Sequence, residues 1–117
     1  MKRNTALLKE QLIQTGIEEI GKHGIEQLSL RTVAKACGVT HGSPYRHFEN
    51  KEGYLKVVLT QLSLFLNQEI NEKIDVTGSA RDQLTRLGLN FIIFAKTYPH
   101  FFEALFIKFP FKYMKVT

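Results

Sequence analysis

The sequence lacks the features that define several classes of protein. It has a single cysteine, Cys37, among 117 residues, so no intrachain disulfide can form and a reducing compartment is expected. Its most apolar stretch, residues 87–109, is interrupted by charged residues and a proline, whereas a membrane span needs roughly 20 apolar residues. The basic N-terminus is followed by an amphipathic pattern, so no signal peptide is expected. These absences predict a cytoplasmic protein with no membrane segment.

Motifs for catalysis and metal binding are also missing. The chain has no nucleophile elbow, no phosphate-binding glycine loop and no spaced carboxylate pair in a defined context. No two of its four histidines stand at i, i+4 spacing with a carboxylate partner, and no cysteine cluster accompanies them. The sequence therefore predicts a protein that is not an enzyme and that has no cofactor and no metal site.

The charge of the chain is mildly basic, with a formal net charge of +5. Such an excess permits contact with nucleic acid or with an anionic membrane but demonstrates neither. The basic residues are scattered and do not form a band on one helix face, which disfavours an amphipathic membrane-surface protein. Hydrophobic residues make up 44% of the chain, enough to build a packed core.

Apolar residues recur at steps of three and four along most of the chain, which is typical of helices with one buried face. The pattern predicts helices over residues 6–23, about 30–37, about 41–47, 51–70, 80–97 and 99–108. Residues suited to start these helices are Ser29, Thr40, Asn50 and Ser79, and residues suited to end them are Gly24, Gly38, Tyr98 with Pro99, and Pro110. No strand-like alternation is present, so the predicted fold class is all-α.

The second and third predicted helices are separated by only three residues, Gly38-Val39-Thr40. Two short helices joined this tightly cross steeply, and the first and fourth helices can back them, which is the architecture of a helix-turn-helix. Ala34 is small where the helices approach, and Gly38 permits the unusual backbone of the turn. The expected fold is a three-helix DNA-binding head, a long fourth helix and a partial helical C-terminal domain.

The second helix of such a unit lies in the major groove of DNA, because that groove admits one α-helix. Its outward residues are then the candidate base readers, and groups at helix starts can bind phosphates. The predicted readers are His41, Gly42, Ser43 and Arg46, and the predicted phosphate contacts are Arg31, Thr40, Tyr45, His47 and Lys51. A cation at the start of a helix is electrostatically unfavourable, which supports a phosphate-binding role for Lys51.

This segment resembles the tetracycline-repressor (TetR) family of bacterial transcriptional regulators over about residues 8–66. The specific part is the run Tyr45-x-His47-Phe48-x-x-Lys51, at a fixed distance after a turn of the form Ala-x-x-x-Gly-Val. The resemblance implies DNA contacts by Arg31, Thr40, His41, Gly42, Ser43, Tyr45, His47 and Lys51, with His41 and Ser43 facing bases. It implies a sequence-specific repressor that binds a palindromic operator in double-stranded DNA as a homodimer.

A weaker resemblance continues through residues 87–106, which look like the start of the family's effector-binding domain. It implies a small-molecule effector held by Leu62, Phe65, Phe91, Phe94, Phe102 and Phe106, although these residues could equally be plain core. The family's chain normally continues beyond this length, through the helices that form its dimer. We therefore expect a DNA-binding domain over residues 1–50 and a connecting helix with a truncated effector domain over residues 51–117.

The C-terminal part is unusually aromatic, with seven of the nine phenylalanines between residues 91 and 111. A layer of three helices offers one inner face, which cannot cover all of these rings. The sequence thus predicts an exposed apolar patch and self-association through residues of about 91–111. It leaves open an alternative function, that of a truncated, non-enzymatic helical module that associates with partner regulators.

Overall fold

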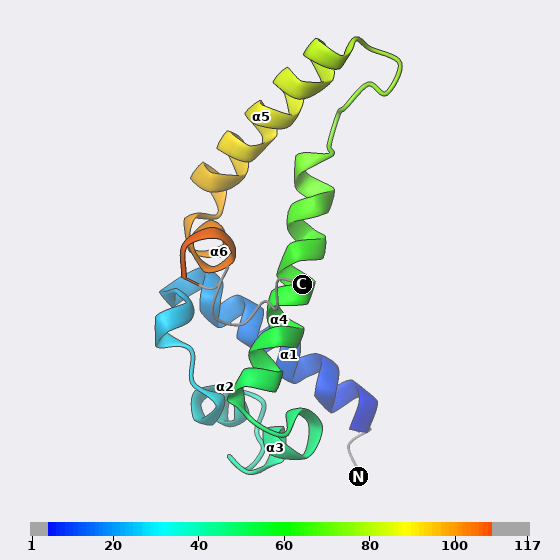
Figure 1. The fold of residues 1–117 in the computed structure, drawn as a ribbon. Helices are drawn as coiled ribbons and strands as arrows, with labels where there is room; N and C mark the ends of the chain where they lie inside the picture. The colour runs from blue at the N-terminus through cyan, green and yellow to red at the C-terminus, as the bar shows by residue number, and fades with distance from the viewer. Residues whose placement is uncertain (1–4, 109–117) are drawn as a thin grey trace.

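The computed structural model describes residues 5–108, which form helices joined by short turns (Figure 1). In chain order the elements are α1 Thr5–His23, the 3-10 turn η1 Ile25–Gln27, α2 Leu30–Ala36, α3 Ser43–Phe48, α4 Lys51–Ile70, α5 Ala80–Thr97, α6 Pro99–Glu103 and the π-helical turn η2 Ala104–Lys108. The predicted all-α class is confirmed for these residues. The expectations for Phe109, Pro110 and Phe111 lie outside the described residues.

Three of the predicted helix starts are confirmed by side-chain caps. Ser29 accepts a hydrogen bond from the backbone N–H of Thr32 at 3.4 Å. Asn50 caps α4 by accepting from the N–H of Gly53 at 2.8 Å, and Ser79 caps α5 in the same way at 3.1 Å. Each cap satisfies a backbone donor that the first turn of a helix leaves without a partner.

The predicted start of the third helix is wrong. The helix begins at Ser43, not near His41, and the side chain of Thr40 does not cap it. Residues 41 and 42 form a turn instead, and this turn places Pro44 at the second helical position. A proline there sacrifices no helical hydrogen bond, because the first N–H groups of a helix have no intrahelical acceptor. The link between α2 and α3 is therefore six residues long and not three.

Tyr54 of α4 lies at the centre of the core, and its side chain is fully buried. Its phenol donates a hydrogen bond to the carbonyl of Leu12 in α1 at 2.6 Å, and its ring packs edge-on against Phe48. Burial raises the pKa of Tyr54, and proximity to Cys37 raises it further, so the phenol stays protonated and remains a donor. The surrounding core is formed by Leu12, Ile13, Ile20, Ile25, Leu28, Leu30, Val33, Phe48, Leu55, Val58, Leu59, Leu62 and Ala104.

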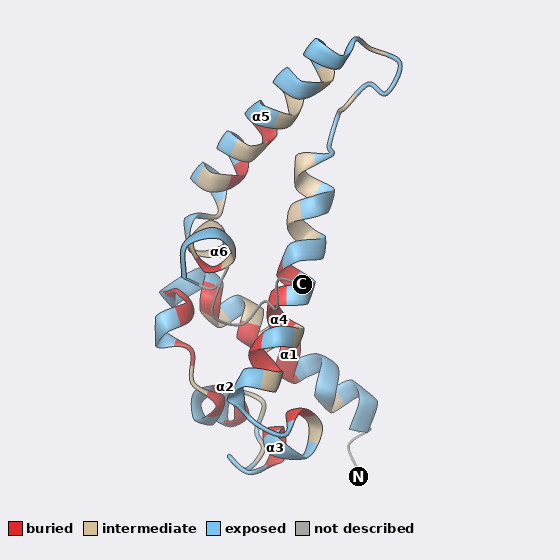
Figure 2. Cartoon of the chain, viewed as in Figure 1, coloured by how far each residue is buried: buried red, intermediate tan, exposed pale blue. Residues whose placement is uncertain are grey.

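The molecule is elongated, with extents of 54 × 31 × 29 Å. The elements α1, α2, α3 and the first half of α4 form a packed head, while the second half of α4 and α5 extend away from it as two antiparallel helices (Figure 1). Most buried residues lie in the head (Figure 2). Within α5, the buried residues are Asn90 and Phe94. The predicted boundary between two domains at residue 50 stays a prediction. Residues on both sides of this boundary pack in one hydrophobic core.

The chain returns to the head through α6, which packs on α1. The ring of Phe101 lies close to Gly21, and the imidazole of His100 lies close to Gly24. Beyond it, Lys108 forms an ion pair with Glu26 of η1. Gly24 has φ of 86°, a conformation that favours glycine, and it ends α1 as the sequence predicts. None of the helices within residues 5–108 combines the length and the apolar character that crossing a membrane requires.

The packing of Tyr54 on α1 generates a first prediction. A methyl group at Gly16 would collide with the Tyr54 ring and hydroxyl, so we expect Gly16→Ala to lower the free energy of unfolding by about 1–3 kcal/mol. The matched control is Gly88→Ala in α5, where a Cβ meets nothing within 4 Å. This control is expected to stabilise by roughly 0.5–1 kcal/mol, as alanine favours the helix. Urea unfolding of both variants measures these two changes in the free energy of unfolding. Equal changes in the two variants would contradict the prediction.

Candidate nucleic-acid interface

The residues predicted to touch DNA gather at the end of the head formed by α2, α3 and the start of α4. The side chains at this end that are exposed to solvent are Arg31, Thr40, His41, Tyr45, Arg46 and Lys51, and Gly42 is exposed with them. His47 is half-buried, and Ser43 is only 9% exposed. The structure thus brings the elements that carry the predicted set to one end of the head and leaves most of the set exposed, whereas Ser43 is almost buried.

The turn between α2 and α3 is held by its backbone. Gly38 has φ of 73°, a region that side chains disfavour, and Val39 donates its N–H to the carbonyl of Ala34 at 3.0 Å. Cys37 is half-buried beside it, with its sulfur 3.3 Å from the hydroxyl of Thr15 in α1. These contacts fasten the turn to the rest of the head, so the start of α3 has a defined position.

The short helix α3 has one inward and one outward face. Pro44 and Phe48 are buried in the head, whereas Tyr45 is 48% exposed and Arg46 is exposed beside it. A helix of six residues is not stable alone, because too few hydrogen bonds offset the cost of its nucleation. The buried pair therefore determines which side chains α3 presents to a partner.

A sharp junction places the start of α4 next to α3. Glu49 adopts φ of 65°, an uncommon value for a residue with a side chain, and Asn50 then caps the new helix. Gly53 must be small, since a Cβ there would strike the carbonyl of Phe48. Lys51 is consequently the first residue of α4, exposed at the edge of the same surface.

The cations of this surface are available to an anionic partner. Within residues 5–108 the ion pairs are His23 with Glu19 and Lys108 with Glu26, and neither includes Arg31, Arg46 or Lys51. The positive charge is not continuous, because Glu49 and Glu52 flank Lys51 in the sequence. The arrangement suits discrete contacts with phosphates and base edges more than a uniform electrostatic attraction.

The residues predicted to hold a small molecule do not form one site. Phe65 and Phe94 share an aromatic cluster, in which the ring of Phe65 also lies 5.1 Å from Tyr98 and 6.2 Å from Phe101. A second cluster joins Phe106 to Phe91 at 6.0 Å and to Phe102 at 4.9 Å. Leu62 lies in the core of the head with 1% exposure.

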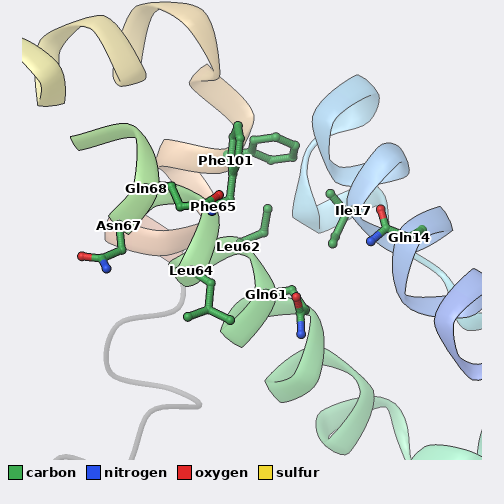
Figure 3. A pocket seen from close by; sticks show the side chains of 9 residues that line it. All are labelled: Gln14, Ile17, Gln61, Leu62, Leu64, Phe65, Asn67, Gln68 and Phe101. Atoms are coloured by element: carbon green, nitrogen blue, oxygen red, sulfur yellow. The ribbon is translucent and has the colours of Figure 1, made fainter. Parts of the chain in front are cut away.

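An open hollow of about 550 Å³ lies beside α4, between it and α1 (Figure 3). Its lining is apolar side chains and carboxamides, namely Gln14, Ile17, Gln61, Leu62, Leu64, Phe65, Asn67, Gln68 and Phe101. It includes Leu62 and Phe65 of the predicted set and excludes the other four. The contribution of α1 was missed, because no local sequence pattern reveals which faces of two distant helices will meet.

Comparison with known proteins agrees with this geometry. Residues 12–58 match a family of domains described as bacterial regulatory proteins, tetR family. Over 43 residues the chain is 42% identical to the probable acrEF/envCD operon repressor of Escherichia coli K12, which is 37% of this chain and 20% of that protein. Over 94 residues it is 27% identical to the HTH-type transcriptional regulator TtgR of Pseudomonas putida, covering 76% of this chain and 45% of that protein.

The fold matches a solved TetR-family transcriptional regulator from Haemophilus influenzae RD with a TM-score of 0.58. The match has 23% identity and covers 83% of this chain and 53% of that one. The head is thus a helix-turn-helix domain of the kind found in bacterial regulators. Residues 12–58 match the TetR family, which agrees with the predicted family for the head. It spans between a fifth and about half of the length of these relatives, and the individual contact residues stay predictions.

Gly42 provides a test of the surface that leaves the fold intact. A Cβ at this position meets nothing within 4 Å, and the backbone has φ of −81°, so a larger side chain is accommodated without strain. We expect Gly42→Leu to keep the unfolding midpoint of the parent but to weaken DNA binding at least tenfold, by holding the backbone away from the groove. Thermal unfolding and a gel shift measure the two effects. Unchanged DNA binding would remove Gly42 from the interface.

Proposed function

We propose that the chain is a sequence-specific DNA-binding transcriptional regulator that acts as a repressor on a palindromic operator. The observation that carries the proposal is the exposed surface of α3 and the start of α4, displayed on a packed head whose sequence matches the TetR family. The name of the Escherichia coli relative agrees with this proposal, since that protein is described as a probable operon repressor.

The proposed reading places α3 in the major groove, with His41, Gly42 and Arg46 nearest the bases. Arg31, Thr40, Tyr45, His47 and Lys51 then contact phosphates on either side, which positions the head without reading sequence. Ser43 remains a predicted base contact. Because its side chain is almost buried, we expect it to contribute less to base recognition than His41. Two heads would occupy half-sites about 34 Å apart and block transcription by occupancy. No chemical step and no cofactor is needed, and the site of action is the cytoplasm, where bacterial DNA lies.

For a small-molecule effector we propose the hollow between α1 and α4. Its nine lining residues are apolar or carry carboxamides, and none is charged, so it suits an uncharged molecule with a few hydrogen-bonding groups. Ile17 and Leu62 line the hollow, and both helices that supply them also build the head. A ligand there would press on the helix whose first residue is Lys51.

The alternative, a protein-interaction module, is favoured by a different observation. Several large apolar side chains at the C-terminal end are exposed, namely Leu84, Leu89, Ile92, Ile93, Phe106 and Ile107. We propose self-association of the chain through this region, of which residues 91–111 are the part expected from the sequence. A sequence-specific gel shift at physiological salt separates the two functions, since a pure interaction module would give none.

Lys51 tests the phosphate contacts. We expect Lys51→Ala to weaken binding to all DNA sequences alike and to reduce the slope of log K against log salt by about one unit, because one fewer counterion is released. Lys22→Ala, an exposed lysine at the other end of the head, is the matched control and should leave the slope unchanged. If the slope of Lys51→Ala equals that of the parent at both low and moderate salt, Lys51 is an ordinary solvated residue.

His41 and Ser43 test base reading. We expect His41→Ala to change the preferred operator sequence, because a good base contact contributes about 1–3 kcal/mol of discrimination. Ser43→Ala should change the preference less, since the serine is almost buried. Selection from randomised DNA with both variants gives the comparison. If His41→Ala selects the same consensus DNA sequence as the parent, His41 does not contact bases. If Ser43→Ala changes the consensus more than His41→Ala does, Ser43 is the more important base contact.

A further inference from the structure

Lys9 occupies an unusual position on α1. It stands three residues before Leu12 and four before Ile13, so it continues the stripe of α1 that is buried in the head. Apolar side chains, Leu12, Ile13 and Ile20 among them, fill this stripe further along the helix, whereas Lys9 is exposed. A cation therefore stands where the core of the head meets the solvent.

The ammonium group of Lys9 is held at the end of α3. Its Nζ lies over the ring of Phe48, 5.8 Å from the ring centroid. Phe48 is the last residue of α3, and its ring packs against the buried Tyr54. A cation over an aromatic face is attracted by the ring, which restricts the positions that the ammonium group takes. The charge of Lys9 thus lies beside the junction of α3 and α4, where Lys51 begins the second helix.

The first turns of α1 lie at the end of the head that carries α3. Figure 1 shows the N-terminal end of α1 and the helix α3 at the same end of the molecule, and the two helices pack on one another. The predicted DNA contacts come from α2, the turn after it, α3 and the start of α4, and none comes from α1. Lys9 also precedes residues 12–58, the part of the chain that matches the TetR family.

The charge of Lys9 is not paired with a carboxylate in the part of the chain that the structure describes, since neither of the ion pairs there includes it. The first turn of α1 also lacks an acidic residue, so nothing in that turn offsets the positive end of the helix dipole. The positions one turn away on α1, where an acidic residue could pair with Lys9, hold Thr5, Ala6, Leu12 and Ile13. Positive charge is thus available here to an anionic partner.

We propose that Lys9 is a further phosphate contact of the DNA-binding head, so that the interface extends onto α1. This inference rests on the proposed DNA-binding function. A helix in the major groove has a phosphate backbone on each side, so a cation held beside the end of α3 faces a phosphate. Lysine suits this contact, because its ammonium group is a compact point charge that binds phosphate without reading a base. Lys9 therefore adds affinity for all DNA sequences alike.

Lys9→Met tests the contact, because methionine keeps an unbranched side chain that packs on the Phe48 ring but removes the charge. Binding of the full chain to a short labelled duplex of mixed sequence is measured by fluorescence anisotropy between about 50 and about 200 mM salt. We expect the slope of log K against log salt to fall by about one unit, and the affinity at about 0.1 M salt to fall about eightfold. Lys9→Arg, which keeps the charge, should retain the slope and the affinity of the parent.

The matched control is Lys22→Met, which removes the charge of an exposed lysine at the other end of α1. This control should also keep the slope and the affinity of the parent. Circular dichroism verifies that the variants are folded. Lys9→Gln, which lacks the charge as well, replaces Lys9→Met if the methionine variant is unstable.

A double variant separates a direct contact from an effect through Phe48. If Lys9 acted only by packing on this ring, methionine would replace it without a change in the salt slope. For a direct contact, Lys9→Met combined with Lys51→Ala should lower the slope by about two units, since each lysine releases its own counterion. A double variant with the slope of Lys51→Ala alone would overturn the proposal.

The outcomes distinguish this inference from the proposed function. If the parent shows no salt-dependent binding to duplex DNA, the proposed function is refuted, and the role of Lys9 with it. If the parent binds and Lys51→Ala lowers the slope, while Lys9→Met and Lys9→Gln do not, the contact by Lys9 alone is refuted. A loss of slope in Lys9→Met that Lys9→Arg does not share supports the contact.

Discussion

The head depends on the contact between Tyr54 and α1. The phenol of Tyr54 is fully buried, so its hydroxyl cannot donate a hydrogen bond to water and needs an acceptor inside the protein. The carbonyl of Leu12 is that acceptor. The ring also needs Gly16 beside it, because any larger residue would occupy its place. One side chain thereby sets both the distance and the register between α1 and α4. The two helices that pack on this pair, α2 and α3, take their positions from it.

The same contact reaches the candidate interface through Phe48. This residue packs its ring against Tyr54 at 5.0 Å and is the last residue of α3. The carbonyl of Phe48 then faces Gly53, which fixes where α4 begins and hence where Lys51 stands. The position of Lys51 on the surface thus depends on the core through two contacts, that of Tyr54 with Phe48 and that of Phe48 with Gly53. Recognition of a rigid partner such as DNA benefits from this arrangement, because ordering the side chains on binding costs less when their backbone is already fixed.

Local signals in the sequence were sufficient to predict most helix ends and the family that residues 12–58 match. Ser29, Asn50 and Ser79 are capping residues in front of apolar periodicity, and each cap is present in the structure. Thr40 is the same kind of residue, yet α3 starts three residues later, because the buried Pro44 and Phe48 decide the helix position. Propensity competes here with tertiary packing, and packing prevails. The turn η1 was missed, since a single 3-10 turn has no periodicity to detect.

The two predicted sites differ in how far apart in the sequence their residues lie. The predicted DNA-contact set spans 21 residues, so the turn that separates its two helices is a feature of one short segment. The aromatic residues between Leu62 and Phe106 could be identified as a group, but their division into two clusters depends on how α5 and α6 fold back. Periodicity says that a helix has an apolar side and does not say which neighbour covers it. For α5 the pattern even indicates two such sides.

The two halves of the molecule meet on α1, which gives that helix a role in both. Its inner side builds the core with Leu12 and Ile20, its Ile17 lines the hollow, and its last turns receive α6. The contacts with α6 use the two glycines Gly21 and Gly24, where the absence of side chains allows Phe101 and His100 to approach the backbone. A shift of α6 would therefore move the rings of Phe101 and His100 directly against the backbone of α1. Through α1, the C-terminal helices are thus connected to the core on which α3 packs.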